Sequence, residues 1–296
     1  MAADSYWLGV VLAIGSGVVN NFGTVMQKKV VNDRKSDDKF MRGLIKNPVW
    51  FSGLLLQIAA GSMLFMLAQL YIGPALIPGL MALGLIVLAI GSLKIVGEKL
   101  GKAEIAGIAL MIIGISFLGL SNMAIDVNGF NFSDVGFIAR TTIFTLVLVV
   151  TSLAFVIRQR KHERFRGILL ALVSGYMFTL SNFWISMLMG NIDQVFGGTA
   201  VLLEWVLFII AAAVLVLSNM YGLTVLQEAF KSGDASKLIP IQQIPIQLAG
   251  IFVYFLIFVM TPAEPISAVW LFFGIAFIIM STFLLGKQQA RMESIK

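Results

Sequence analysis

Nine stretches of about 20 mostly apolar residues occupy most of this chain of 296 residues. A helix of about that length crosses the hydrocarbon core of a bilayer. The stretches are continuously apolar and lack the alternation of a transmembrane barrel, so they favour helices over strands. We therefore expect an all-α polytopic membrane protein. The expected spans are residues 6–27, 49–71, 75–96, 103–124, 135–157, 167–190, 200–222, 235–260 and 266–286.

The scarcity of charge narrows the class of protein further. Only 12% of the residues are charged, against about 25% in soluble domains. Cysteine is absent and His162 is the single histidine, which excludes thiol catalysis, a disulfide framework and a metal site built on several histidines. No phosphate-binding loop of the GxxxxGK[ST] type occurs either. We expect neither an enzyme nor a bound cofactor.

The positions of the basic residues predict the orientation in the membrane. In a nine-span arrangement, twenty of the 21 Lys and Arg residues fall on one side, after spans one, three, five and seven and in the C-terminal tail. Cytoplasmic loops collect Lys and Arg, so we expect a multi-pass cell-membrane protein with its N-terminus outside and its C-terminus in the cytoplasm. The net charge of +6 is then explained without nucleic-acid binding. The opposite side carries acids alone as charged residues: Asp4, Asp126, Asp134, Asp193 and Glu264.

Two segments of the chain resemble each other at a nearly constant separation. GVVLAIGSG (Gly9 to Gly17) matches GILLALVSG (Gly167 to Gly175) at five of nine positions, with an offset of 158. Leu76-Ile77-Pro78 recurs as Leu238-Ile239-Pro240 with an offset of 162. The shared order of these matches indicates an internal repeat.

The repeat predicts an arrangement of four spans, one connecting span and four more spans. The first repeat would comprise residues 1–124 and the second residues 167–296, joined by a fifth helix and a basic loop in 125–166. One connecting crossing inverts the second repeat relative to the first. Inverted repeats are typical of alternating-access carriers, which bind substrate where the repeats meet. The alternative is a duplication kept for packing alone.

Charged residues within the spans are functional candidates, because insertion of a charge costs about 2.5–3.5 kcal/mol. Arg140 in span five and Glu204 in span seven lie at similar depths from the outer side. An ion pair between them is plausible, in which Glu204 couples a proton or cation and Arg140 tunes its charge. The alternative is an interfacial or structural pair.

Polar side chains form a stripe in each of two equivalent spans. Asn21 and Thr24 follow Gly17 at helical spacing, and the repeat offset maps them onto Thr179 and Asn182 in span six. Two matching stripes suggest a shared central cavity, with packing between helices as the alternative. The sequence assigns no set of residues to a metal.

The eighth span is the most unusual, because two prolines are expected to interrupt it. Pro240 and Pro245 flank or adjoin the amides Gln242, Gln243 and Gln247. A proline frees a backbone carbonyl, which in lipid must find a partner or line a wet cavity. Broken helices of this kind coordinate ions or polar substrates in transporters. The third span has a corresponding proline at its start, Pro78.

The segment PALIPGLMALGLIVLAIGSLKIVGEKLGKAEIAGIALMIIGI (Pro74 to Ile115) is similar to the drug/metabolite transporter superfamily. Three further segments resemble the magnesium transporters of the NIPA type: GVVLAIGSG followed by Gln27-Lys28-Lys29, LQEAFKSGDASKLIPI, and FFGIAFIIMSTFLLG. The resemblance covers most of the chain and implies the four-one-four helical fold and transport of Mg²⁺ or another cation.

Three functions stay open at the level of sequence. The first is a NIPA-like carrier of Mg²⁺ or another cation, and the second is an exporter of a small polar organic solute. The third is a membrane scaffold or lipid-handling protein that transports nothing. Mg²⁺ is usually bound through one or two carboxylates, and the spans offer mainly amides instead. The expected partners are the bilayer and a small solute or cation, with a homodimer left open.

Overall fold

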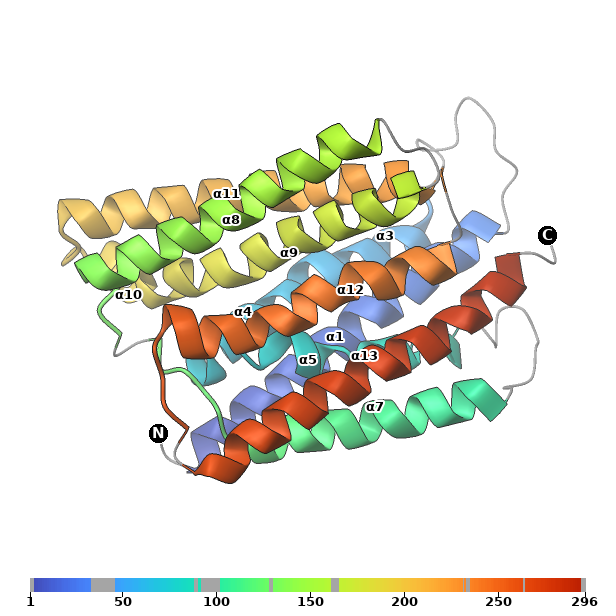
Figure 1. Cartoon of the computed structure of the whole chain (residues 1–296), viewed down its shortest axis with the longest axis horizontal. Coiled ribbons are helices and arrows are strands. Elements are labelled where there is room, and N and C mark those ends of the chain that lie inside the picture. The colour runs from blue at the N-terminus through green and yellow to red at the C-terminus, as the bar shows by residue number, and fades with distance from the viewer. Residues whose placement is uncertain are drawn as a thin grey trace.

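The computed structural model describes long helices that run side by side, with the start of the first and the end of the last at opposite ends of the bundle (Figure 1). The described residues are 3–32, 46–87, 90–91, 102–127, 130–160, 165–230, 232, 235–262 and 264–293, and they contain no strand. The helices are α1 (Ala3–Asn32), α3 (Pro48–Leu55), α4 (Ser62–Ile72), α5 (Ile77–Met81), α7 (Lys102–Ser121), α8 (Val135–Gln159), α9 (Arg166–Gly190), α10 (Ile192–Phe196), α11 (Leu202–Phe230), α12 (Ala235–Phe252) and α13 (Pro265–Glu293).

Six helical segments of the described part are long and apolar enough to cross a membrane, and three more are shorter but apolar. Each of them lies within or over one of the expected spans. The all-helical class is thereby confirmed. The six are Asp4–Gln27, Pro48–Ile72, Val135–Gln159, Arg166–Gly190, Leu202–Leu226 and Pro265–Leu284, and the three are Ile77–Val87, Ile105–Ser121 and Ile241–Ile257.

The helix of the second span is continuous but contains a wider turn. Asn47 caps its start, because its Oδ1 accepts from the N–H groups of Val49 at 2.9 Å and Trp50 at 3.2 Å. A π-helical turn, η1 (Leu56–Gly61), joins α3 to α4. π-turns inside α-helices occur frequently at functional sites, and this one lies against α1.

The third span departs from the single helix expected over 75–96. α5 ends at Met81, and the chain continues with tighter bonds such as Leu85 N–H to Ala82 O at 2.9 Å. The cause is a close crossing with α1, since a Cβ added at Gly17 would overlap the carbonyl oxygen of Met81. Residues 88–89 and 92–101 lie outside the described part, as do most of the basic segment 28–46 and His162.

The eighth span also differs from expectation, because α12 runs without a break through Pro240 and Pro245. Pro245 is buried, and a Cβ on Gly175 of α9 would overlap its ring, so the neighbouring helix makes room for it. The departure from α-helix comes later, in the π-helical segment η3 (Val253–Ile257). The prolines therefore do not interrupt the helix where the sequence predicted.

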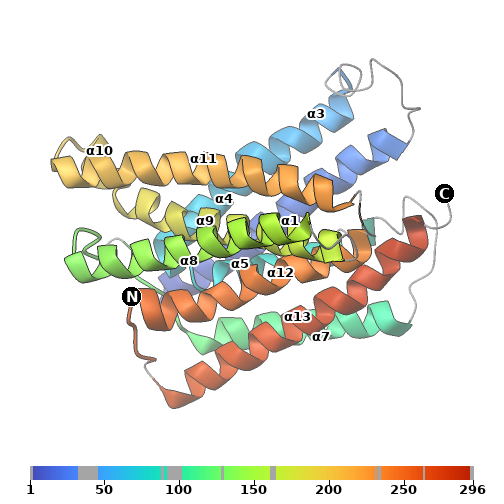
Figure 2. The same ribbon diagram turned by 45° about the horizontal axis from the view of Figure 1, so that its top comes forward.

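α9 is the central helix of the second half of the chain, packed along α8, α11 and α12. At the opposite edge of the bundle α7 and α13 lie side by side, as both views show (Figure 2). There a Cβ on Gly114 or on Gly274 would be 2.9 Å from the carbonyl oxygen of the other glycine. Such close backbone approach is the usual use of small residues between membrane helices.

Candidate functional site

One contact between the two halves of the chain joins α4 to α9. Gln69 of α4 is fully buried, and its Nε2 donates to the backbone oxygen of Asn182 at 3.3 Å. The Gln69 Oε1 has no hydrogen-bond partner among the described residues. A buried unpaired oxygen carries a desolvation cost of about 1–3 kcal/mol, so this atom is available to a ligand or water.

Thr179 adds a second unpaired oxygen one turn before Asn182 on α9. Its side chain is 3% exposed, and its Oγ1 has no partner in the described part of the chain. The sequence predicted Thr179 and Asn182 as pathway residues, whereas Gln69 was not among the predicted residues. The one sequence signal at Gln69 is that it is an amide within an apolar span.

A second contact between the halves joins α12 to α5. Gln247 is 3% exposed, and its Nε2 donates to the carbonyl oxygen of Pro78 at 3.3 Å and to Gln243 Oε1 at 3.4 Å. The Gln247 Oε1 is unpaired within the described ranges. Pro78 occupies the first turn of α5, so the second half of the chain reaches the beginning of the third span.

Gln242 faces a different neighbour from Gln243 and Gln247. Its Nε2 donates to Ser174 Oγ at 2.8 Å, and Ser174 in turn donates to the carbonyl oxygen of Gly222 at 2.8 Å. This chain of bonds links α12, α9 and α11. The Gln242 amide therefore donates within the second half of the chain.

The polar side chains of the stripe on α1 form hydrogen bonds with groups of α1 itself and of the adjacent second span. Asn21 Nδ2 donates to Gly17 O at 3.0 Å, and Thr24 Oγ1 donates to Asn20 O at 3.0 Å. Gln57 Nε2 donates to Thr24 Oγ1 at 3.3 Å. No side-chain hydrogen bond among the described residues joins this stripe to the one on α9, so the two predicted stripes do not meet directly.

Arg140 and Glu204 do not pair in the structure. Arg140 Nε donates to the carbonyl oxygen of Ile257 at 2.9 Å, where η3 ends and that carbonyl lacks a helical partner. Glu204 Oε2 accepts from the N–H of Val201 at 2.9 Å at the start of α11. Both therefore act as caps, and the ion pair found within the described ranges joins Arg166 to Glu228.

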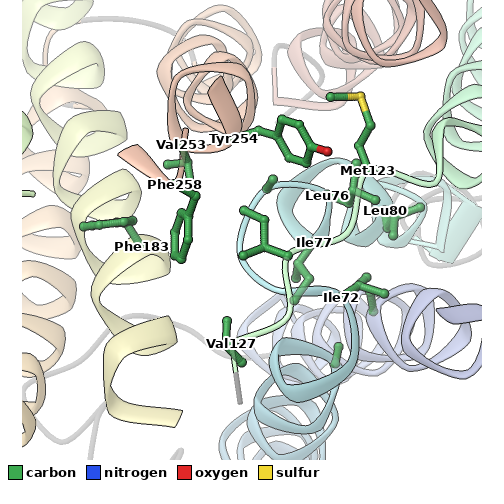
Figure 3. Close-up of a cluster of buried hydrophobic side chains, with 14 of the residues drawn as sticks. Ile72, Leu76, Ile77, Leu80, Met123, Val127, Phe183, Val253, Tyr254 and Phe258 are labelled. Atoms are coloured by element: carbon green, nitrogen blue, oxygen red, sulfur yellow. The ribbon is translucent and has the colours of Figure 1, made fainter. Parts of the chain in front are cut away.

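An apolar cluster closes the end of the bundle where α4 and η3 finish. Figure 3 shows Phe183 of α9 beside Phe258, and Tyr254 pointing from η3 toward Met123. The ring centroids of Phe183 and Phe258 are 6.5 Å apart. Because Gln69 lies one helical turn before Ile72 of this cluster, the polar groups are covered by apolar side chains at this end.

The chemistry available to a ligand is that of neutral oxygens. The described residues contain no group of three or more His, Cys, Asp or Glu side chains that could hold a metal. Unpaired amide and hydroxyl oxygens come instead from α4, α9 and α12. Such groups bind a hydrated cation or a polar solute, since Mg²⁺ keeps several of its waters when it binds to proteins.

The chain has been compared with known proteins. A family model described as magnesium transporter NIPA matches residues 4–291. No curated protein and no solved structure gives a match.

Proposed function

Because the chain belongs to the NIPA magnesium transporter family, we propose that this multi-pass membrane protein carries Mg²⁺ or another cation by alternating access between two inverted repeats. The observation that carries the proposal is two of the contacts between the halves, the hydrogen bonds from Gln69 to Asn182 and from Gln247 to Pro78. Each of these glutamines leaves a buried amide oxygen unpaired. Carriers built from inverted repeats bind their substrate where the repeats meet.

Matching hydrogen bonds support the inverted repeat. Ser16 Oγ donates to Gly61 O at 2.8 Å, and Ser174 Oγ donates to Gly222 O at 2.8 Å. The two serines are 158 residues apart and the two glycines 161, as the repeat requires. Each bond joins the first helix of a proposed repeat to the second.

Two close backbone approaches support the same symmetry. Gly17 lies against the carbonyl oxygen of Met81, and Gly175 lies against that of Gln242, again at offsets of 158 and 161. Within the proposal, 1–124 and 167–296 are the two repeats, and 125–166 supplies the connecting helix. α8 then packs on the second repeat as a fifth crossing.

The cation would be held with part of its hydration shell. Mg²⁺ prefers oxygen ligands in near-octahedral geometry and sheds water reluctantly. Gln69 Oε1, Thr179 Oγ1 and Gln247 Oε1 are neutral acceptors for such waters. The outer gate in this account is the apolar cluster that includes Phe183 and Phe258.

The proposed orientation places the N-terminus outside and the C-terminus in the cytoplasm. Basic residues lie at one set of helix ends: Lys29 at the end of α1, Lys102 at the start of α7, Arg158 at the end of α8 and Arg166 at the start of α9. Cytoplasmic loops are enriched in Lys and Arg. Alternating access would then move the cation between the acidic outer side and this basic inner side.

A polar organic solute is the second candidate substrate, favoured by one observation. The groups at the junction are amides, which offer both donors and acceptors, and Glu204 is engaged at the start of α11 rather than there. A neutral site of this kind suits a solute with hydroxyl or amide groups.

The test is Mg²⁺ uptake by the purified chain in liposomes that contain a Mg²⁺ indicator. The proposal predicts saturable uptake above that of protein-free liposomes. Equal uptake in the two preparations would end the cation proposal. A panel of polar solutes supplied under a proton gradient then identifies the second candidate. Failure of every solute favours the scaffold or lipid-handling interpretation.

A further inference from the structure

A hollow of about 390 Å³ lies on the outside of the bundle between α8, α9 and α11. Its walls include Val149 of α8, Leu180 of α9 and Leu217 of α11. Leu217 is 66% exposed, so the hollow opens toward the surroundings of the bundle. In a membrane protein those surroundings are the acyl chains of the bilayer.

One polar atom in this hollow lacks a partner. Ser152 lines it, is only 4% exposed, and its Oγ makes no hydrogen bond to any described residue. A helical hydroxyl ordinarily donates to the carbonyl four residues earlier, as Thr142 Oγ1 does to Ile138 O on the same helix at 2.8 Å. The free hydroxyl of Ser152 therefore indicates a ligand that has a hydrogen-bonding group.

A second hollow, of about 270 Å³, follows along the same pair of helices toward their basic end. It is lined by Phe155 and Arg158 of α8 and by Phe165, Ile168 and Leu169. Arg158 lies six residues beyond Ser152, about 9 Å along the helix axis. Its guanidinium is not in an ion pair with any described carboxylate, and Arg160 caps the C-terminal end of the same helix two residues later.

We propose that these two hollows together bind one anionic phospholipid from the leaflet at the basic end of the bundle. The acyl chain occupies the apolar hollow between α8, α9 and α11. The phosphate lies against Arg158, and Ser152 donates to an ester carbonyl between them. Basic pockets at the edge of membrane helices recognise anionic headgroups in this way. The site lies outside the junction of the two halves and does not depend on the transported substrate.

The charge at Arg158 selects the occupant. A neutral lipophilic molecule would fill the apolar hollow but leave the guanidinium without an anion. A free phosphate ion would satisfy Arg158 but leave the 390 Å³ hollow empty. A lipid with a net negative headgroup satisfies both and is already present in the surrounding bilayer.

The experiment measures thermal stability in detergent against added phosphatidylglycerol, phosphatidylcholine with the same chains, and inorganic phosphate. Phosphatidylglycerol is expected to raise the melting temperature at the lowest concentration. Arg158→Gln should weaken its apparent affinity about fivefold, the loss of one basic contact to an anionic headgroup. Lys29→Gln, an exposed base on α1, is the charge-matched control and should leave the affinity unchanged.

A second pair of variants tests the apolar hollow. Leu217→Trp narrows it, whereas Val216→Trp changes a neighbouring exposed residue that does not line it. The first variant should reduce the effect of phosphatidylglycerol and the second should retain it. Equal effects of the two lipids, a full effect of inorganic phosphate alone, or unchanged binding in both Arg158→Gln and Leu217→Trp would overturn the proposal.

Discussion

α1 and α9 share a nine-residue segment with five identical positions but have different surroundings. In α9, 67% of the membrane-span window is buried, against 33% in α1. The polar side chains of α1 are closed by local bonds, with Asn21 and Thr24 both donating to backbone oxygens four residues earlier. On α9 the hydroxyl of Thr179 is buried and unpaired. Equivalent positions in the proposed repeat therefore need not have equivalent chemistry.

The difference concentrates the proposed pathway on the second half of the chain and on α4. The polar stripe on α1 would stabilise the packing of α1 against its neighbours, while Thr179 and Gln69, the partner of Asn182, would contact the ligand. The same substitution in the polar stripe of each helix can separate these roles, because it should alter stability in one helix and transport in the other.

The largest effect is expected where both helices make the same close approach. Gly17→Ala should lower the free energy of unfolding by about 3 kcal/mol, because the new methyl group would overlap Met81 O. Gly175→Ala should have a similar effect through Gln242 O. The measurement is thermal unfolding in detergent.

The matched control for these variants is Gly15→Ala. A Cβ at Gly15 would be 3.7 Å from Leu64 Cδ1, an ordinary contact, so stability should change little. If Gly17→Ala and Gly15→Ala unfold at the same temperature, the close crossing of α1 and the third span is wrong.

The next largest effect is expected on transport when the Gln69 hydrogen bond between the halves is removed. Gln69→Leu keeps the volume but removes the amide that bonds to Asn182 O. Transport should fall at least about tenfold, because a tenfold change corresponds to the loss of one polar contact of about 1.4 kcal/mol. The melting temperature should be retained, because the leucine side chain leaves no buried amide unpaired.

Gln194→Leu is the control for that prediction. Gln194 on α10 also has a buried unpaired Oε1, but it lies outside the junction of the halves, so transport should be unchanged. Full transport by Gln69→Leu would remove Gln69 from the pathway.

A smaller and opposite pair of effects is expected from Thr24→Val and Thr179→Val. The first removes the acceptor of Gln57 Nε2 and should cost about 1 kcal/mol of stability with transport retained. The second removes an unpaired hydroxyl and should reduce transport several-fold with stability unchanged or higher. Uptake assays and unfolding curves of both variants test this pattern. Reduced transport in Thr24→Val and reduced stability in Thr179→Val would assign the pathway to α1.

The smallest effect is expected at Glu204. Gln at this position still accepts from Val201 N–H, so Glu204→Gln should change stability by less than about 0.5 kcal/mol and leave uptake intact. Loss of Mg²⁺ uptake in Glu204→Gln with a normal melting temperature would instead assign Glu204 to cation coupling.

The helices followed from the sequence because each apolar stretch is long enough to span a bilayer, and length and hydropathy are local properties. The break after Met81 did not follow from the sequence, because it depends on contact with Gly17, a residue far away in the chain. Pro240 and Pro245 predicted a break that α12 does not have, since Gly175 leaves space for Pro245.

Part of the candidate site followed from the repeat and part of it did not. Thr179, Asn182 and Gln247 were predicted from periodicity and from unusual amides. Gln69 has no equivalent in the other half of the chain, so its role became visible only when the structure placed it against Asn182. The pairing of Arg140 with Glu204 failed because both side chains find backbone groups nearer by.

Alternating access requires the two proposed repeats to move relative to each other around the Gln69 and Gln247 contacts. The chain has no cysteine, so spin labels can be attached at Leu120→Cys and Phe196→Cys, exposed residues at the ends of α7 and α10. Pulsed electron resonance then measures the distance between the halves. Alternating access predicts two distance populations whose ratio shifts with Mg²⁺. One distance, unchanged at saturating Mg²⁺ in protein that transports it, would contradict alternating access.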